Sequence, residues 1–461
     1  MKVFDTLTNT KKELEFEDKI RIYLCGVTVY DESHIGHART IIVFDVLRKF
    51  LEDKNIPVEL IQNFTDVDDK IINKAQSENL TALDISSKYI KNYFDDFRQL
   101  NVKDATIFPK ATEHIDEIIS FVKKLIDNNH AYVSKNGVYF SVEKFSGYGK
   151  LSKKKIEELQ SGSRIEVDEA KRDPLDFAIW KCSDIEPLWD SPWGKGRPGW
   201  HIECSAMSLK YLGTNFEIHG GGRDLIFPHH ENEIAQSESL TGDNFAKNWM
   251  HVGMVTINGE KMSKSIGNIR SIKHVLENWG PNIIRLFCLS GHYSKPIDYS
   301  EELLNENLIK WRQAEAAYYE LIHADGSNSQ GIEWLQKISE EFDNALQDDL
   351  NTHLATTAFF QLVKEINRVS VENIFGKDES QLIKKEFSRM MKILGLIIPQ
   401  ISIDEKQEID KMIADREIFR KEKQFEKADQ IRDKLNEMNV VLVDHKKRTV
   451  WMKKEKIKSE N

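Results

Sequence analysis

The sequence predicts an α/β protein: a split, doubly wound parallel sheet (Rossmann-like) with an insertion, followed by a helical bundle and a small C-terminal α+β domain. Three patterns predict this architecture. Strand, helix and strand signals follow one another in two separate segments, a mixed stretch lies between them, and helical periodicity dominates the chain after residue 301. A strand–helix–strand crossover favours parallel strands, which bind ligands at their carboxyl ends.

The first half of the sheet is expected near the start of the chain. Its strand, helix and second strand are predicted at residues 20–25, 40–52 and 58–63. The strands are apolar runs of strand length, and apolar side chains recur at helical spacing between them. Gly26 permits a turn directly after the first strand, so Cys25 and the string His34-Ile35-Gly36-His37 are predicted at the ligand edge.

A second set of signals is typical of the other half of such a fold. It comprises a strand, a glycine run, a helix and a further strand, at residues 216–219, 220–222, 225–240 and 249–255. Helical and hairpin-like signals between the halves, at residues 113–128 and 131–142, favour an insertion that splits the sheet.

The rest of the chain is predicted to be helical until a small strand pair near its end. A bundle is expected over 301–399, one helix over 404–438, and strands over 440–443 and 449–452. We therefore expect six regions: the first half of the sheet domain at 1–110, a connective insertion at 111–199, the second half at 200–255, a loop region at 256–305, the bundle at 306–400 and the C-terminal domain at 401–461.

Charge and composition limit the classes of function. The 461 residues carry 65 Lys and Arg against 75 Asp and Glu, a formal net charge of -10, which argues against electrostatically nonspecific nucleic-acid binding. The last 22 residues carry seven basic and three acidic side chains, so this tail either contacts nucleic acid or is simply solvated. No apolar run reaches the ~20 residues that span a bilayer, and no signal peptide leads the chain, so we expect a cytoplasmic protein with reduced thiols and no membrane partner.

Two short strings predict how the protein handles a polyphosphate. His34-Ile35-Gly36-His37 supplies two imidazoles, with a glycine that lets a nucleotide approach the backbone at a strand-to-helix junction. Lys261-Met262-Ser263-Lys264-Ser265 supplies two ammonium groups on a serine-flanked loop. Each string alone is commonplace, but both together on the two halves of the sheet predict an ATP site. We expect the catalytic residues to be His34, His37, Lys261 and Lys264, and ATP to be bound by the same residues together with Gly36.

The pair of strings resembles the signature of class I aminoacyl-tRNA synthetases. That resemblance implies an enzyme that activates an amino acid as its adenylate and then transfers it to the end of a tRNA. In-line attack of a carboxylate on the α-phosphate of ATP demands positioning and charge stabilisation, for which Lys264 is the preferred residue. Mg²⁺ is the expected counterion of the ATP phosphates, although the sequence contains no obvious carboxylate cage for it.

Four dispersed residues form a candidate metal site. Cys25 and Cys204 both belong near the ligand edge of the sheet. His229 and Glu233 are four apart on a predicted helix, which places them on one face. Two thiolates, an imidazole and a carboxylate form a reasonable zinc set. Spacing alone leaves two alternative ligands open, His230 and Glu231.

Three further segments resemble those of cysteinyl-tRNA synthetases, and the resemblance runs the whole chain. The segments are Cys25-Gly26-Val27-Thr28-Val29-Tyr30-Asp31, Gly199-Trp200-His201-Ile202-Glu203-Cys204-Ser205-Ala206-Met207 and Phe227-Pro228-His229-His230-Glu231-Asn232-Glu233. The resemblance implies one zinc ion per chain that takes the thiolate of the substrate cysteine, and it selects His229 rather than His230 as a ligand. The implied metal ligands are Cys25, Cys204, His229 and Glu233. Zinc would reject serine, because a neutral hydroxyl is a much poorer ligand than a thiolate.

The same resemblance implies a pocket around the amino acid, formed by Thr65, Trp200, His219 and Asp224. Asp224 is expected to hold the ammonium group, Trp200 to close the pocket and His219 to line it. The nearby acids Asp66, Asp68 and Asp69 are expected to be structural or surface groups. Cys182 and Cys288 are expected to be packed thiols, and the role of Arg223 is open.

The expected function is ATP-dependent ligation of L-cysteine to tRNA(Cys) by a monomer, through a cysteinyl adenylate. The region at 256–305 is then expected to carry the second string and to contact the tRNA stem, and the C-terminal domain at 401–461 is expected to bind the anticodon. One alternative is a ligase that passes activated cysteine to an amino sugar, which should lack this domain. The other is a noncatalytic tRNA- or nucleotide-binding paralogue, against which the two intact strings argue.

Overall fold

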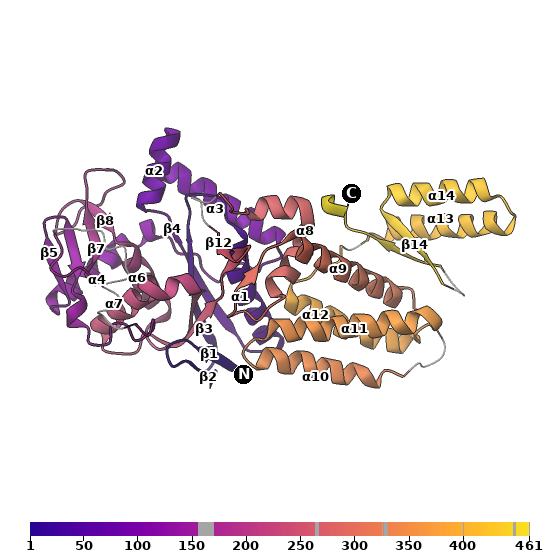
Figure 1. Cartoon of the computed structure of the whole chain (residues 1–461), viewed down its shortest axis with the longest axis horizontal. Coiled ribbons are helices and arrows are strands. Elements are labelled where there is room, and N and C mark those ends of the chain that lie inside the picture. The colour runs from indigo at the N-terminus through magenta and orange to yellow at the C-terminus, as the bar shows by residue number, and fades with distance from the viewer. Residues whose placement is uncertain are drawn as a thin grey trace. The chain divides into compact units, whose positions relative to one another are not determined.

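The computed structural model describes residues 1–154, 170–262, 267–324, 326, 331–399, 401–445 and 449–460. The chain divides into two compact units (Figure 1). The sheet unit comprises Met1–Lys273, Gly291–Asp298 and Gln347–Leu350, and the helical unit comprises His274–Ser290, Tyr299–Leu346 and Asn351–Asn461.

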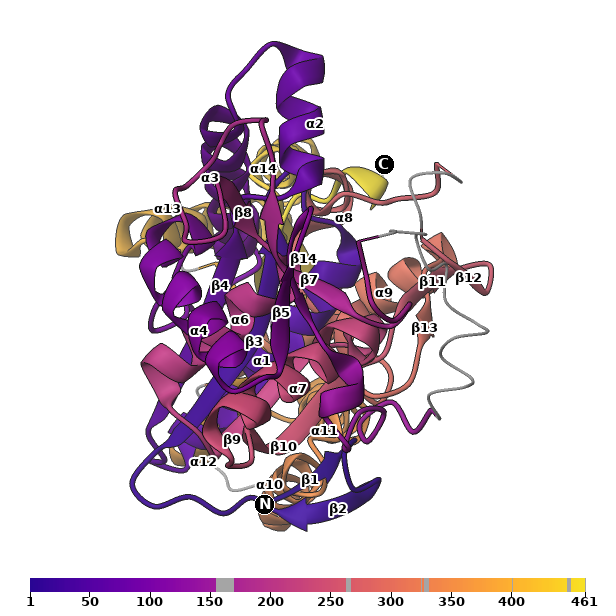
Figure 2. The ribbon, with the colours of Figure 1, turned by 90° about the vertical axis from the view of Figure 1, so that its left-hand side faces the viewer.

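A four-stranded parallel sheet forms the core of the sheet unit. The strand order is β10-β9-β3-β4, and the bounds are β3 Ile20–Thr28, β4 Val58–Thr65, β9 Phe216–Gly222 and β10 Ala246–Val252. The two halves of the sequence pattern join where β3 pairs with β9, with Tyr23 opposite His219. The predicted split parallel sheet is therefore confirmed (Figure 2).

Helices connect and cover these strands. Helix α1 (Ile35–Asp53) joins β3 to β4, and α6 (Trp200–Leu212) packs against both of these strands. Helix α1 begins five residues before the predicted start, because the His34 side chain accepts the Gly36 N–H and caps the first turn. The first string thus forms the helix N-terminus.

The helix predicted over 225–240 starts later than expected. Strand β9 continues through the glycines at 220–222, and two irregular turns, Arg223–Leu225 and Ile226–His230, follow it. Helix α7 then spans Glu231–Thr241. Phe227 is extended (φ -138, ψ 132) because a residue that precedes proline is pushed out of helical backbone geometry. His229 therefore lies ahead of the helix, not within it.

In its described residues, 111–154 and 170–199, the insertion contains one α-helix and a small antiparallel sheet. The helix is α4 (Ile115–Asp127), and the sheet has the order β5-β6-β7-β8, with bounds Ala131–Ser134, Gly137–Phe140, Phe177–Cys182 and Gly196–Pro198. Helices α2 (Asp69–Glu78) and α3 (Ala82–Gln99) follow β4 and were not anticipated from the sequence.

Short strands complete the sheet unit. An N-terminal pair consists of β1 (Lys2–Asp5) and β2 (Thr10–Glu13). A three-stranded sheet contains β11 (Val255–Ile257), β12 (Glu260–Lys261) and β13 (Ile297–Asp298). The β11–β12 hairpin carries Lys261 at its end, and helix α8 (Ile272–Leu289) follows along the chain.

The helical unit contains a bundle and a small C-terminal domain. The bundle helices are α9 Glu301–Ile322, α10 Glu333–Gln347, α11 Thr352–Glu372 and α12 Lys377–Leu394. The single helix predicted over 404–438 is wrong: α13 (Ile403–Lys421) and α14 (Phe425–Glu437) pack together, separated by a turn in which Lys423 has φ 60. A left-handed residue cannot continue an α-helix, so the chain reverses there. The predicted strand pair is present as β14 (Val440–Asp444) and β15 (Thr449–Lys453).

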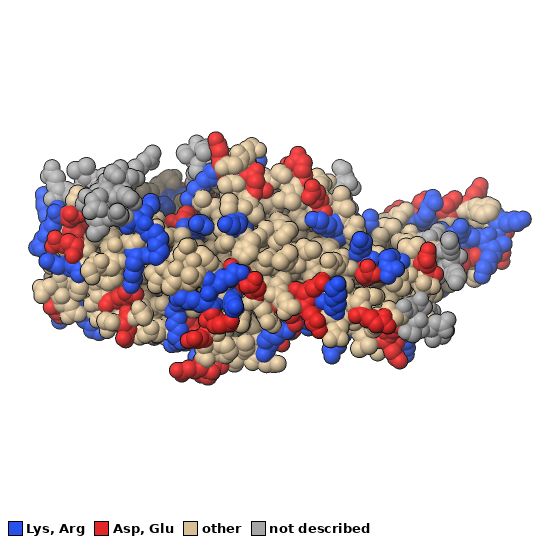
Figure 3. Space-filling view, turned by 60° about the horizontal axis from the view of Figure 1, so that its bottom comes forward, with Lys and Arg blue, Asp and Glu red and all other residues tan. Residues whose placement is uncertain are grey.

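Basic and acidic side chains are interspersed over the face drawn in Figure 3, as the near balance of charges in the sequence suggests. In the part of the chain that the structure describes, no helix is long and apolar enough to cross a membrane.

Candidate active site

Four donor side chains from separate segments meet beside β3. Cys25 lies on β3, Cys204 on α6, His229 ahead of α7 and Glu233 in the first turn of α7. The Cys25 Sγ lies 3.9 Å from the Cys204 Sγ and 3.4 Å from Glu233 Oε1. His229 Nε2 lies 3.1 Å from the same carboxylate oxygen. All four residues are buried, and one ligand atom from each lies within 4.8 Å of the others, so the structure brings the predicted metal set together.

Burial and charge make this cluster suitable for a divalent cation. Burial raises the pKa of the Cys25 thiol well above its usual range, and the neighbouring Cys204 and Glu233 raise it further. The pKa of Cys204 is also raised. Its hydrogen bond with Cys25 lowers the pKa, but burial and the nearby carboxylates together raise it by more. Burial lowers the pKa of His229 well below its usual range, so the ring is neutral and able to act as a ligand. A bound cation is the group that would allow these thiols to ionise in a buried site.

A second donor group overlaps the first. It shares Cys25 and Glu233 and is completed by His219 and His230. His230 Nε2 lies 3.3 Å from the Cys25 Sγ, and His219 Nε2 lies 2.9 Å from Glu233 Oε2. Of the two alternative ligands left open by spacing, the structure brings His230 to the cluster. The Glu231 carboxylate instead accepts backbone N–H groups of residues 151 and 152.

Two further histidines contact the donors and were missed in the sequence. His201 Nδ1 lies 2.8 Å from His229 Nδ1, and His251 Nε2 lies 2.8 Å from His230 Nδ1. These contacts leave the Nε2 atoms of His229 and His230 directed at the cluster. His201 lies in the same short segment as Cys204, which was a usable signal, whereas His251 is brought in only by the pairing of β10 with β9.

Two of the predicted pocket residues lie directly at the donors. The Trp200 ring is stacked on the His229 ring with centroids 4.2 Å apart, and Trp200 is 37% exposed, so it covers this ligand from the solvent side. His219 is fully buried and stacks on Trp249 while it hydrogen-bonds to Glu233.

The other two predicted pocket residues lie at neighbouring positions. Thr65 is the buried last residue of β4 and hydrogen-bonds to Glu203, which precedes Cys204 in the chain. Burial raises the pKa of Glu203 well above its usual range in spite of this hydrogen bond. Asp224 lies in the turn after β9, where its Oδ2 is 3.2 Å from the Lys261 Nζ. Asp224 thus links the end of β9 to the second string.

The first string presents two stacked imidazoles at the N-terminus of α1. The His34 and His37 rings are parallel within 22° at a centroid distance of 3.7 Å. The Gly36 N–H donates to His34 Nδ1 at 3.1 Å, and the His34 N–H faces His37 Nδ1 at 3.4 Å. Burial and the neighbouring His34 lower the pKa of His37 well below its usual range, so its ring is neutral. With its Nδ1 accepting, the neutral His37 ring keeps its proton on Nε2 and can donate it to a phosphate oxygen.

The second string lies against the first. A Cβ atom added at Gly36 would lie 3.4 Å from the Met262 side chain, and the Ile35 N–H donates to the Arg270 carbonyl at 3.0 Å. The Ile272 N–H similarly donates to the Ser33 carbonyl at 2.8 Å. Of the second string, the structure describes Lys261 and Met262, whereas Ser263, Lys264 and Ser265 lie outside the described residues.

The remaining acids near β4 have structural partners. Asp66 accepts hydrogen bonds from the N–H and hydroxyl of Thr112, and Asp68 caps α2. Asp69 forms ion pairs with Lys181 and Arg197.

The other unassigned residues differ in burial. Arg223 donates to the Ser294 carbonyl at 3.3 Å. Cys288 is fully buried, whereas Cys182 is only partly buried, with its Sγ 3.3 Å from the Trp193 carbonyl. The expectation of packed thiols therefore describes Cys288 better than Cys182.

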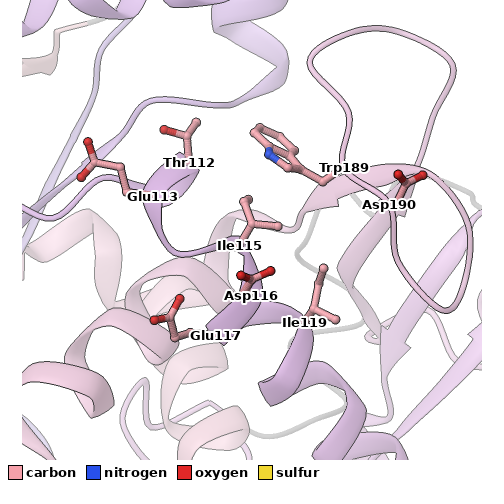
Figure 4. Close-up of a pocket in the computed structure, with 8 residues that line it drawn as sticks. All are labelled: Thr112, Glu113, Ile115, Asp116, Glu117, Ile119, Trp189 and Asp190. Atoms are coloured by element: carbon pink, nitrogen blue, oxygen red, sulfur yellow. The ribbon is translucent and has the colours of Figure 1, made fainter.

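A separate pocket of about 390 Å³ lies between α4 and the loop before β8 (Figure 4). Its lining is acidic, with Glu113, Asp116, Glu117 and Asp190 around Trp189. Two of these carboxylates already pair with Lys110 and Lys210. None of the predicted site residues lines this pocket.

A parallel sheet with the two strings at one edge defines the class I aminoacyl-tRNA synthetases. The family of class I (C) tRNA synthetase catalytic domains matches residues 11–308, the DALR domain family matches 341–398, and the cysteinyl-tRNA ligase anticodon binding domain family matches 404–451. The chain belongs to the cysteine–tRNA ligase family.

Full-length similarity supports this assignment. The chain is 46% identical to the cysteine–tRNA ligase of Thermodesulfovibrio yellowstonii, over 98% of this chain and 99% of the relative. It is 44% identical to the corresponding ligase of Aquifex aeolicus, over 99% of both chains, and 43% identical to that of Thermococcus kodakarensis, over 98% of both. The fold is similar to that of Mycobacterium tuberculosis methionyl-tRNA synthetase in complex with methionyl-adenylate, with a TM-score of 0.59, 15% identity, and coverage of 82% of this chain and 88% of that chain.

Proposed function

We propose that the protein attaches L-cysteine to tRNA(Cys) in two steps that consume ATP. The observation that carries this proposal is the buried cluster of two thiols, an imidazole and a carboxylate in the same unit as the two stacked histidines of the first string. Such a cluster has no use in binding ATP, but it selects a thiol. The full-length relatives carry the name of this activity.

One zinc ion per chain is proposed at Cys25, Cys204, His229 and Glu233. This group is preferred to the overlapping one because it contains both thiols, and zinc favours sulfur ligands. Zinc, when bound, supplies a Lewis acid that accepts a thiolate far better than a neutral hydroxyl. Trp200 then closes the pocket over His229, and His219 fixes the orientation of the Glu233 carboxylate.

Adenylate formation is proposed to use both strings. The carboxylate of cysteine attacks the α-phosphorus of ATP, the bond from that phosphorus to the bridging oxygen of the leaving group breaks, and pyrophosphate departs. His34 and His37 donate from Nε2 to phosphate oxygens, and Lys261 and Lys264 neutralise the charge that accumulates on them. Gly36 leaves room for the nucleotide, Mg²⁺ accompanies the ATP phosphates, and Thr65 and Asp224 hold the amino end of cysteine.

Transfer to tRNA follows. A ribose hydroxyl of the terminal adenosine attacks the carbonyl carbon of the adenylate, and AMP leaves. The C-terminal domain at 401–461 is proposed to contact the anticodon, which favours tRNA over an amino sugar as the acceptor. We propose a monomer that works in the cytoplasm, where tRNA and ATP are available.

The test is ATP–pyrophosphate exchange with cysteine and with serine, with zinc measured on the same sample. Exchange that depends on cysteine, with about one zinc per chain and little exchange with serine, is expected. Exchange with both amino acids would remove the metal from the selection of the substrate. Exchange without aminoacylation of purified tRNA would revive the amino-sugar alternative, and the absence of any exchange would revive the noncatalytic one.

A further inference from the structure

Arg39 lies two residues beyond the end of the first string and is fully buried in the sheet unit. Its guanidinium donates from Nη1 to the Gly253 carbonyl at 2.8 Å and to the Met254 carbonyl at 3.1 Å. Its Nη2 donates to the His292 carbonyl at 3.2 Å. A buried cation that binds three backbone carbonyls fixes the path of the chain at all three places.

These carbonyls lie at the entry to the hairpin that carries the second string. Gly253 and Met254 form the link between β10 and β11, and β11 pairs with β12, which ends at Lys261. The link is tightly packed, since a Cβ atom at Gly253 would lie 2.3 Å from the Lys295 carbonyl. The third carbonyl belongs to the segment 291–298, which includes β13, the other partner of β11.

The chain that follows the second string is also fastened to the start of α1. The backbone pairs of Ile35 with Arg270 and of Ile272 with Ser33 hold the chain where it leaves the second string. Arg39 therefore provides the attachment at the entering end, and backbone hydrogen bonds provide the attachment at the leaving end. Both attachments hold the chain on either side of the second string in a fixed position relative to the first turn of α1, where His34 and His37 lie.

We propose that Arg39 is a positioning residue for adenylate formation, which sets the place of the Lys261 hairpin relative to the histidines of α1. The proposal rests on the function proposed above. The three hydrogen bonds that carry the proposal go to the β10–β11 link and to His292, so the proposed role concerns ATP and not the choice of amino acid. A lysine keeps the charge but cannot span three carbonyls with one ammonium group.

The experiment compares Arg39→Lys and Arg39→Gln with Arg48→Lys as the matched control. Arg48 lies on the same helix and is also buried, but its guanidinium donates to the Glu52 carboxylate and the Asp104 carbonyl rather than to the β10–β11 link. Single-turnover adenylate formation is measured per active site, so that any unfolded fraction drops out. Both Arg39 variants are expected to slow this step by about tenfold or more, because small misplacements of reacting groups are costly. The KM for cysteine and the bound metal should stay as in the parent protein, and Arg48→Lys should retain the parent rate.

A double-mutant cycle separates positioning from general damage. If Arg39 acts through the hairpin, Arg39→Lys should slow a background that carries both Lys261→Ala and Lys264→Ala by no more than about twofold, since the positioned ammonium groups are already absent. Equal slowing in both backgrounds, the parent rate in Arg39→Lys, or a matching loss of bound metal would each overturn the proposal.

Hydrogen exchange provides a readout that does not depend on the reaction. Backbone amides of residues 253–261 should exchange faster in Arg39→Lys than in the parent protein and in Arg48→Lys. Unchanged exchange there would overturn the proposal even in an active enzyme. Failure of the proposed function has another signature, the absence of cysteine-dependent exchange in the parent protein.

Discussion

The chemical properties of single residues in the site depend on their burial next to one another. Cys25, Cys204, His229 and Glu233 are ordinary side chains in an extended chain. The shifted pKa values of Cys25, Cys204 and His229 arise when the four are removed from water together, as do their proposed donor roles. The sequence predicted these four to be neighbours because all of them fall in the three segments that resemble those of cysteinyl-tRNA synthetases. His201 and His251 could not be found in this way, since their roles follow from contacts made across the fold.

The first prediction concerns the thiol of Cys204. Cys204→Ser should lower the bound zinc and raise the KM for cysteine, because the hydroxyl is a poor ligand for this metal. Changes in residues that merely support metal ligands already cost about 10–100-fold in metal affinity, so loss of a direct ligand should cost at least that much. Elemental analysis and exchange kinetics measure the two effects. Cys182→Ser, which alters a partly exposed thiol on β7, is the control, and unchanged zinc in Cys204→Ser would remove that residue from the site.

The second prediction concerns Asp96, a buried carboxylate on α3. Burial, with Glu32 and Asp95 nearby, raises its pKa to about 6, and only Lys273 opposes this. The folded state therefore binds this proton more tightly than the unfolded chain, and the ionised form destabilises the fold. The penalty is absent below the unfolded pKa of 3.8, grows as the pH rises, and is complete above the folded pKa.

Asp96→Asn removes this penalty. Thermal melts should show a midpoint raised by about 2 °C at neutral pH, with the difference shrinking as the pH falls toward the unfolded pKa. A lower midpoint at neutral pH, or a difference that grows in acid, would contradict the assigned direction.

At the scale of elements, the junction of β3 with α1 decides how the first string is used. A helix N-terminus has free N–H groups and a positive dipole end, and His34 caps it by accepting the Gly36 N–H at Nδ1. Local signals predicted the core of most strands and helices. They failed at the start of α7 and between α13 and α14, where one proline and one left-handed residue outweigh the apolar periodicity.

The third prediction tests this junction through Gly36→Ala. The new Cβ would lie 3.0 Å from the His34 ring and 3.4 Å from the Met262 side chain, so the ring must move. Alanine suits a helix better than glycine, so the thermal midpoint should hold or rise slightly. The KM for ATP should rise by about fivefold or more, since the capped ring is displaced from its donor position. A fall in stability with an unchanged KM would contradict this account.

At the scale of the whole molecule, the proposed catalytic residues lie in a different unit from the regions that match tRNA-binding domain families. All four proposed metal ligands, both strings and Arg39 lie in the sheet unit, and the families of the DALR and anticodon binding domains match the helical unit. Stabilisation by the metal should therefore be confined to one unit.

The fourth prediction is that metal removal affects one unfolding transition. In calorimetry, a chelator should lower the transition of the sheet unit and leave that of the helical unit in place. When the free metal is present at a thousand times its Kd, binding adds ~4 kcal/mol to the stability of the folded sheet unit, so the shift of its transition temperature should be readily measured. The Cys204→Ser protein should be insensitive to the chelator. Movement of both transitions, or of neither, would count against a metal held by the sheet unit alone.

The class of fold and the two strings follow from the sequence, because apolar periodicity and residue types are local properties of the chain. The four proposed donors were selected by the resemblance to cysteinyl-tRNA synthetases, since spacing left His230 and Glu231 open. The tertiary structure alone decided that His229 precedes its helix, that His201 and His251 support the donors, and that Asp224 pairs with Lys261. It also decided that Arg39 fastens the second string to the first. These relations join residues far apart in the chain, and they depend on strand order and side-chain packing, which no local pattern specifies.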